Sequence, residues 1–280
     1  MTTGVFLAVL AAAFMHAAWN ALIKVRLDPF LSISLMSLGM GAISLACLPF
    51  VAVPGGWTWV WIWASVALHI GYKLFLVSAY RIGDLGQVYP LARGTAPLLT
   101  ALGSAVLIGE VVSLSAGIAI ALLSLGILLM SLRGAGTAKL GRTTVLYALG
   151  TSGFIALYTL VDGVGGRSAP SASSYTGWLF VLDGLAMGLV CVAVRGRAAV
   201  AAMVPTWRTG LGTGALSLGA YWIVIWAMTQ APIAAVAALR ESSILFALVL
   251  STVMLKERLT AWRITAAVLI LAGVAGLRLA

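Results

Sequence analysis

Long apolar stretches alternate with short polar breaks along the whole chain. Ten stretches of about twenty residues are apolar enough to cross a membrane, because twenty residues of helix rise roughly 30 Å, the thickness of a hydrocarbon core. The breaks are polar or rich in Gly and Pro, as at Asp28 with Pro29 and in the run from Arg133 to Arg142. We expect spans at residues 4–23, 30–52, 58–79, 86–108, 114–132, 144–163, 174–194, 209–229, 233–255 and 262–279.

Two of these spans carry the same polar residues at the same spacing. Arg93 precedes Glu110 by seventeen residues, and Arg240 precedes Glu257 by the same number. Such an offset indicates two copies of one unit, at residues 1–133 and 141–280. Because five spans per copy insert the copies in opposite senses, the predicted fold class is an all-α integral membrane protein of ten transmembrane helices in two inverted five-helix repeats. The same offset also links Ser104 to Ser251 and Gly126 to Gly273.

Composition supports the membrane setting and excludes several other classes. Hydrophobic residues make up 62% of the chain and charged residues 9%, and the mean hydropathy is +1.11. The net charge of +10 comes from scattered Lys and Arg, which form no continuous basic face for nucleic acid. Cys47 and Cys191 lie inside apolar spans, which excludes a disulfide framework or a zinc cluster. We expect no cofactor, no metal and no ATP site, and partners limited to a small-molecule substrate and the lipid bilayer.

The distribution of positive charge predicts an orientation. If the N-terminus lay inside, most basic loop residues would lie outside, which violates the positive-inside rule. The rule therefore favours both termini outside. The residues that decide this are Lys24, Arg26, Arg133, Lys139, Arg142, Arg195, Arg197, Arg208, Lys256 and Arg258.

The two repeated arginines are the strongest functional candidates. Each lies about eight residues inside its span, roughly 12 Å deep, where an unpaired charge is costly. A guanidinium there is suited to hold a carboxylate or phosphate through two parallel hydrogen bonds. The alternative is a structural ion pair with Asp183 or Glu241. Because Glu241 directly follows Arg240, it points about 100° away on a regular helix, so we predict that these two do not pair.

Further polar and aromatic residues recur at helical spacing. His16, Trp19, Asn20 and Lys24 share one face of the first span, while His69, Tyr72 and Lys73 share a face of the third. They either line a cavity or bond across a helix interface. The candidate substrate-binding residues are Trp19, Asn20, Lys73, Tyr89, Arg93, Tyr158, Tyr221, Trp222, Arg240 and Glu241, in a cavity formed by spans one, three, four, six, eight and nine.

The buried carboxylates have two open interpretations. Asp162 and Asp183 either bind protons that couple transport, or serve as counter-ions for the arginines, and His16 belongs with them as a coupling candidate. Glu110 and Glu257 are interpreted as structural, since each ends a helix and precedes a Ser or Thr that can cap the next one.

One short motif suggests catalysis but is rejected. Gly150 to Gly153 resembles the GxSG pattern of intramembrane serine proteases, whose partner histidine follows on a later helix, whereas the only histidines here come earlier. We therefore expect no enzyme.

The whole chain resembles the EamA-type family of ten-helix proteins in the drug/metabolite transporter superfamily. The resemblance rests on His16 to Asn20 with Lys24, on Tyr89 to Gly94 leading to Glu110, on Tyr158 with Asp162, and on Leu239 to Ser242 leading to Glu257. It implies a multi-pass carrier of the bacterial inner membrane, usually an exporter of a small metabolite such as an amino acid. It also implies that both termini lie in the cytoplasm, against the charge distribution.

The sequence therefore predicts a secondary transporter working by alternating access around a midplane cavity, as a monomer or homodimer. Two alternatives remain open, a flippase for a lipid-linked sugar and a non-transporting scaffold or sensor.

Overall fold

The computed structural model describes residues 1–22, 27–82, 85–133, 141–255 and 260–280. In this part of the chain nine segments are long and apolar enough to span a membrane, and a shorter apolar helix covers Leu114–Met130. The helices are α1 (Thr3–Leu22), α2 (Pro29–Cys47), α3 (Thr58–Ile82), α4 (Leu85–Gly103), α5 (Leu114–Arg133), α6 (Arg142–Ser168), α7 (Ala172–Arg195), α8 (Arg197–Met203), α9 (Trp207–Gln230), α10 (Ile233–Arg240), α11 (Ser243–Leu255) and α12 (Ala261–Leu279), with short helical turns at Leu48–Phe50, Ser104–Ile108 and Val204–Thr206. The predicted all-α membrane fold is confirmed. Lys24 and Glu257 lie outside the described residues.

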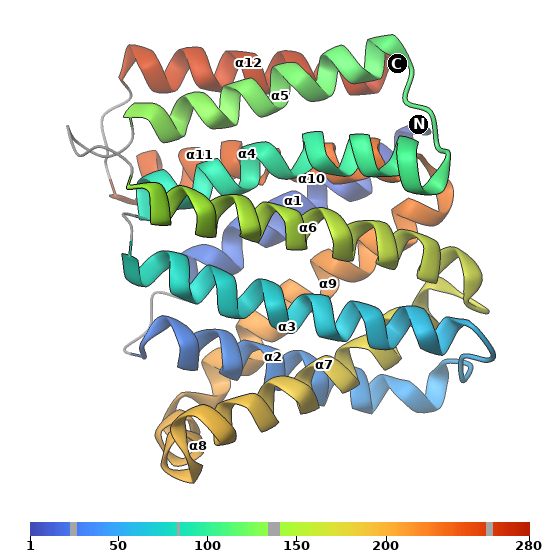
Figure 1. Ribbon diagram of the computed structural model, residues 1–280, viewed down its shortest axis with the longest axis vertical. Helices are drawn as coiled ribbons and strands as arrows, with labels where there is room; N and C mark the ends of the chain where they lie inside the picture. The colour runs from blue at the N-terminus through green and yellow to red at the C-terminus, as the bar shows by residue number, and fades with distance from the viewer. Residues whose placement is uncertain (23–26, 83–84, 134–140, 256–259) are drawn as a thin grey trace.

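The long helices lie side by side, and both chain ends lie at the same edge of the molecule (Figure 1). The most extensive packing joins α5 with α12, α3 with α6, α2 with α7 and α4 with α6. Each of these pairs joins the first half of the chain to the second. The two halves therefore form one helical body rather than two separate ones.

Side-chain caps fix several helix starts. Asp28 accepts hydrogen bonds from the backbone N–H groups of Phe30 and Leu31, and Ser171 accepts one from Ser174. The predicted caps after the two glutamate motifs are also present, because Ser113 accepts from Ala116 and Thr260 accepts from Arg263.

The ninth predicted span, residues 233–255, is broken in its middle. Helix α10 ends at Arg240, and the N–H groups of Glu241 and Ser242 donate to carbonyls only three residues back before α11 begins. Irregular backbone at membrane depth is tolerated where it faces a cavity or protein rather than lipid. The break thus presents Arg240 and Glu241 to the interior of the bundle.

The glycines of α9 allow close helix packing. A Cβ added at Gly214 would lie 2.9 Å from the carbonyl carbon of Gly39 on α2. Only glycine at both positions lets the two backbones approach this closely.

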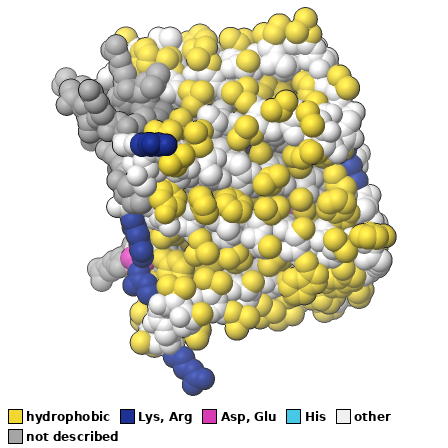
Figure 2. All heavy atoms as spheres, in the orientation of Figure 1, with side chains coloured by type: hydrophobic (Ala, Val, Ile, Leu, Met, Phe, Trp, Pro, Cys, Tyr) yellow, Lys and Arg dark blue, Asp and Glu magenta, His cyan; other side chains and the backbone are white. Residues whose placement is uncertain are grey.

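The outer surface is apolar between two edges that carry charge. Figure 2 shows hydrophobic side chains over this face and most visible Lys and Arg side chains along one edge. Leu107 and Leu189 are examples of large apolar side chains that are more than two-thirds exposed, as lipid contact requires. Arg167 and Arg278 belong to the opposite edge, where the chain ends lie.

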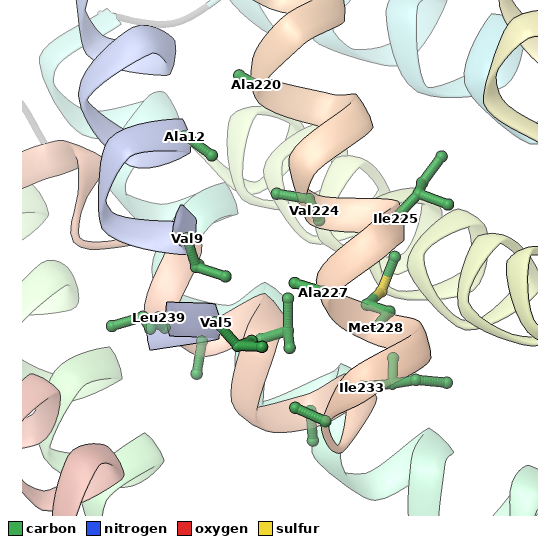
Figure 3. Packing of buried hydrophobic residues seen from close by; sticks show 14 of the residues in the cluster. Val5, Val9, Ala12, Ala220, Val224, Ile225, Ala227, Met228, Ile233 and Leu239 are labelled. Atoms are coloured by element: carbon green, nitrogen blue, oxygen red, sulfur yellow. The ribbon is translucent and has the colours of Figure 1, made fainter. Parts of the chain in front are cut away.

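A packed apolar cluster fills the bundle on the side of the chain ends. Figure 3 shows it where α1 meets α9 and α10. Val9, Met228, Ile233 and Leu239 in this cluster are fully buried.

Candidate functional site

A cavity of about 80 Å³ lies in the interior of the bundle. It has room for several water-sized molecules. Spans one, three, four, six, eight and nine contribute to it as predicted, but α2 and α7 do so as well, through Met36, Met40, Phe180 and Asp183. The other lining residues are Ala12, His16, Trp19, His69, Tyr72, Lys73, Arg93, Tyr158, Ser217, Ala220, Tyr221, Val224 and Arg240.

Two arginines meet one carboxylate at one pole of the cavity. Arg93 on α4 and Arg240 at the end of α10 are 3% and 4% exposed. The Nε atom of Arg93 lies 2.6 Å from Oε2 of Glu241, and Nη2 of Arg240 lies 3.5 Å from Oε1. The prediction that Arg240 and Glu241 do not pair is therefore wrong. It assumed a regular helix through both residues, whereas α10 ends at Arg240 and the chain turns.

This arginine pole keeps unused hydrogen-bonding capacity. In the described part of the chain, Nε and Nη2 of Arg93 and Nε of Arg240 have no hydrogen-bond partner. The N–H at Nε of Arg93 does not point at Glu241 despite the short distance, so that contact is an ion pair without a hydrogen bond. A buried donor left without a partner costs about 1–3 kcal/mol. One carboxylate against two guanidinium groups also leaves one positive charge in excess.

Lys73 and Asp183 form a second ion pair. The Nζ atom of Lys73 donates to both carboxylate oxygens of Asp183, at 2.7 and 2.6 Å. Both side chains are buried, so Lys73 does not extend to the membrane surface. Asp183 and Glu241 were the two carboxylates proposed as ion-pair partners of the arginines. Glu241 pairs with them and Asp183 does not.

Asp162 is surrounded by hydroxyl donors. It accepts hydrogen bonds from Ser65 of α3, from Tyr175 of α7 at 2.9 Å and from Tyr221 of α9. The Nε2 atom of His69 lies 3.4 Å from Oδ2 of the same carboxylate. These contacts hold α3, α6, α7 and α9 around one fully buried negative charge.

Aromatic rings pack between the arginine pole and the group formed by His69, Asp162 and Asp183. The Arg240 guanidinium lies 5.7 Å from the ring centroid of Tyr221, and the Arg93 guanidinium lies at the same distance from Tyr89. Tyr158 packs edge-on against His69, with ring centroids 4.4 Å apart. Such rings supply apolar contact and attract cations at their faces.

The cavity includes most, but not all, of the predicted site residues. Asn20 donates its amide to the backbone oxygen of His16, and Trp222 donates its indole N–H to Ser173. Neither of these two residues lines the cavity. Tyr89, Glu241 and Asp162 lie behind lining residues rather than among them. The residues predicted to bind substrate did not include His69 and Tyr72, although their helical spacing with Lys73 indicates that they share its face of the helix.

Glu110 has the structural role that the sequence suggested. Its carboxylate accepts from the backbone N–H of Ile233 and from the Ser104 hydroxyl, both at 2.9 Å, and lies 3.0 Å from Nη2 of Arg167. It therefore caps the N-terminus of α10.

Ser152, from the protease-like motif, donates to the carbonyl oxygens of Ala92 and Ala148 in helix packing. No group of three or more metal-binding side chains occurs among the described residues.

Membrane-spanning helices around a buried, charged cavity define a multi-pass membrane transporter rather than a soluble enzyme or a simple anchor. Residues 142–279 match the model of the EamA-like transporter family. The chain is a member of this family, which belongs to the drug/metabolite transporter superfamily, and it transports small solutes.

The fold also occurs among solved structures. It matches 28 chains among them, including one in a crystal structure of a protein that is 18% identical. That similarity covers 100% of this chain and 98% of the other, with a TM-score of 0.80. At this identity the similarity establishes the fold alone. No curated protein matches the chain.

Proposed function

We propose that this protein is a secondary transporter that exports a small metabolite with an anionic group, an amino acid or a related solute, from the cytoplasm of a bacterium. The observation that carries the proposal is the arginine pole, where buried N–H groups of Arg93 and Arg240 lack partners and one positive charge is in excess. A carboxylate satisfies both needs at once, because it accepts two parallel hydrogen bonds from a guanidinium.

The depth of the two arginines supports a carrier site. Arg93 is eight residues into α4 and Arg240 is seven residues into α10, which corresponds to about 12 and 10 Å of rise. In a hydrocarbon core roughly 30 Å thick both are near the middle. A charge held there is costly unless it regularly meets an opposite charge.

Alternating access follows from the two proposed repeats, residues 1–133 and 141–280. Reciprocal glycine contacts between α5 and α12 support it. A Cβ on Gly126 would lie 2.8 Å from the carbonyl oxygen of Ala266, and a Cβ on Gly273 would lie 2.7 Å from that of Ala119. The offset is the same within each exchanged pair, since 273 − 126 = 147 and 266 − 119 = 147.

Helices α2 and α7 meet in the same reciprocal way. A Cβ on Gly41 would lie 3.2 Å from the carbonyl oxygen of Phe180, and one on Gly184 would lie 2.8 Å from that of Ser37. Here 184 − 41 = 143 and 180 − 37 = 143. Such exchange of roles is expected where two helices cross on a pseudo-two-fold axis.

The present conformation suits loading from the basic edge, which is the edge that carries most of the visible Lys and Arg side chains (Figure 2). The cavity reaches Trp19, three residues before α1 ends at that edge, while Ala12 and Val224 join it to the buried apolar cluster on the side of the chain ends. The positive-inside rule assigns the basic edge to the cytoplasm and both termini to the outside. A cavity that extends toward the cytoplasmic edge is the arrangement expected before loading in an exporter.

The test begins with thermal stabilisation of the purified protein by carboxylated solutes, amines, inorganic cations and lipid phosphates. Solutes that stabilise it are then tested for transport in proteoliposomes, with Arg93→Ala and a surface control, Arg208→Ala. We expect a carboxylated solute to bind and to be transported, with transport lost in Arg93→Ala alone. Equal uptake by both variants and the parent protein would remove the arginine pole from the mechanism. Stabilisation only by lipid phosphates would favour the flippase alternative.

A further inference from the structure

We infer that His69 binds a proton between Asp162 and Asp183, and that this proton is exchanged for the ammonium group of a zwitterionic solute. The exchange rests on the proposed function, whereas proton binding at His69 does not. This assignment places the proton on an imidazole separate from the arginine pole.

The two ring nitrogens of His69 face two different carboxylates. Nε2 lies 3.4 Å from Oδ2 of Asp162 and Nδ1 lies 3.9 Å from Oδ1 of Asp183. A neutral imidazole has one N–H and one lone pair, so in either tautomer a lone pair faces a carboxylate oxygen. An imidazolium presents an N–H to both sides. The residue is only 6% exposed, and its Nε2 has no hydrogen-bond partner among the described residues.

Other donors already contact the two carboxylates. Asp162 accepts from three hydroxyl groups, and Asp183 accepts twice from Lys73. Both carboxylates are therefore occupied by donors, and the ring, whose Nε2 has no partner among the described residues, is the group left to take up a proton. Uptake forms one N–H bond at the ring lone pair from hydronium, releases water and gives the ring one positive charge.

The surroundings of His69 carry one negative charge in excess. Two carboxylates lie beside it and one ammonium pairs with Asp183, together with neutral hydroxyl and ring groups. The residues in question are Ser65, Tyr72 and Lys73 of α3, Tyr158 and Asp162 of α6, Tyr175, Phe180 and Asp183 of α7, and Tyr221 of α9, with Arg240 of α10 on the far side of Tyr221. A proton on His69 balances this charge, and so does a solute ammonium placed beside Asp183.

The second histidine of the cavity has different neighbours. His16 packs against Trp19, with ring centroids 5.1 Å apart, and lines the cavity together with the guanidinium groups of Arg93 and Arg240. An added proton there would meet like charges instead of a counter-ion. The coupling role suggested for His16 from the sequence is therefore reassigned to His69.

Competition between the proton and the ammonium group sets the direction of coupling. At the arginine pole the solute carboxylate binds whether or not His69 is charged. At the His69 pole, the side of the cavity formed by His69, Asp162 and Asp183, the solute ammonium and the proton compensate the same negative charge. Each therefore weakens binding of the other. A proton entering from outside then displaces the solute, as an exporter driven by the proton gradient requires.

The first experiment observes the ring itself. The chain has two histidines, so His16→Gln leaves a single imidazole, whose ¹⁵N signals report its protonation between about pH 5 and 8. We expect His69 to gain a proton within this range in lipid nanodiscs, and the common L-amino acids, added one at a time, to shift that gain to lower pH when one binds. A ring that stays neutral throughout the range overturns the proton site, even if no solute is bound.

The second experiment counts protons. Adding an amino acid that binds should release about one proton per solute from protein loaded below pH 6 in weak buffer, seen with a pH-sensitive dye. The surface control Arg208→Ala should release as much, while His69→Gln should release none when thermal stabilisation shows that the solute is bound. The matching 2-hydroxy acid, which lacks the ammonium group, should cause no release. Equal release by His69→Gln, or by the hydroxy acid, overturns the exchange.

Discussion

Replacing Arg93 with lysine should separate its charge from its hydrogen-bonding geometry. Lysine keeps one positive charge near Glu241 but offers a single point donor, so the planar pair of N–H groups is lost. In the structure two nitrogens of Arg93, Nε and Nη2, lack hydrogen-bond partners and are available to a carboxylate.

The magnitude follows from these two donors. A hydrogen bond to a charged group contributes about 1.5–3 kcal/mol. Losing one of two such bonds in Arg93→Lys should weaken solute binding about 10- to 150-fold, since 1.4 kcal/mol corresponds to a factor of ten. Arg93→Ala loses both bonds and the charge, and should weaken binding by more than about 100-fold.

The assay is solute-dependent thermal stabilisation, followed by counterflow in proteoliposomes. A solute at 100 times its Kd stabilises the folded state by about 2.7 kcal/mol, so even a tenfold loss of affinity is measurable. Arg208→Lys is the matched surface control and should behave as the parent protein. The reasoning is refuted if Arg93→Lys and Arg93→Ala bind the carboxylated solute as tightly as that control.

Three further predictions concern stability. Asp183→Asn leaves Lys73 buried without its counter-ion and should cost about 3–5 kcal/mol, with the double variant Lys73→Met, Asp183→Asn recovering part of it in thermal unfolding; full additivity of the single changes would contradict the pair. Gly273→Val should cost about 1–3 kcal/mol or more because its Cβ meets backbone atoms of α5, whereas Gly117→Val, with no atom within 4 Å, should cost little. Glu110→Ala should cost about 1–3 kcal/mol through the lost cap of α10, and an unchanged melting temperature would exclude that role.

The sequence predicted where charge is buried better than how it is paired. Polar residues inside apolar spans are expensive, so Arg93, Lys73 and Asp183 stood out without any structure, and each lines the cavity. Their partners were not predictable, because Lys73 and Asp183 are 110 residues apart and on different helices. Only the helix packing decides which carboxylate meets which cation.

Two errors share one physical cause, which is local geometry overriding ideal helical spacing. Helix α10 ends at Arg240, so the 100° rotation that should separate it from Glu241 does not apply. Asn20 follows the cavity face by spacing, yet its amide bonds to the carbonyl of the preceding helical turn. The spacing of residues gives the face of a helix, but short-range hydrogen bonds decide whether a polar group stays free for a solute.

The charge balance of the cavity narrows the solute class. With both histidines neutral, the buried cations Lys73, Arg93 and Arg240 equal the three carboxylates in number, but unevenly, with one positive charge in excess at the arginine pole and one negative at the His69 pole. A lipid-linked sugar diphosphate brings two negative charges and no positive one. It would therefore bring more negative charge than the arginine pole needs and leave the excess negative charge at the His69 pole without a counter-ion. A zwitterion matches both excesses, and because uncompensated charge in a buried site costs several kcal/mol, this match favours an amino acid over a phosphorylated lipid.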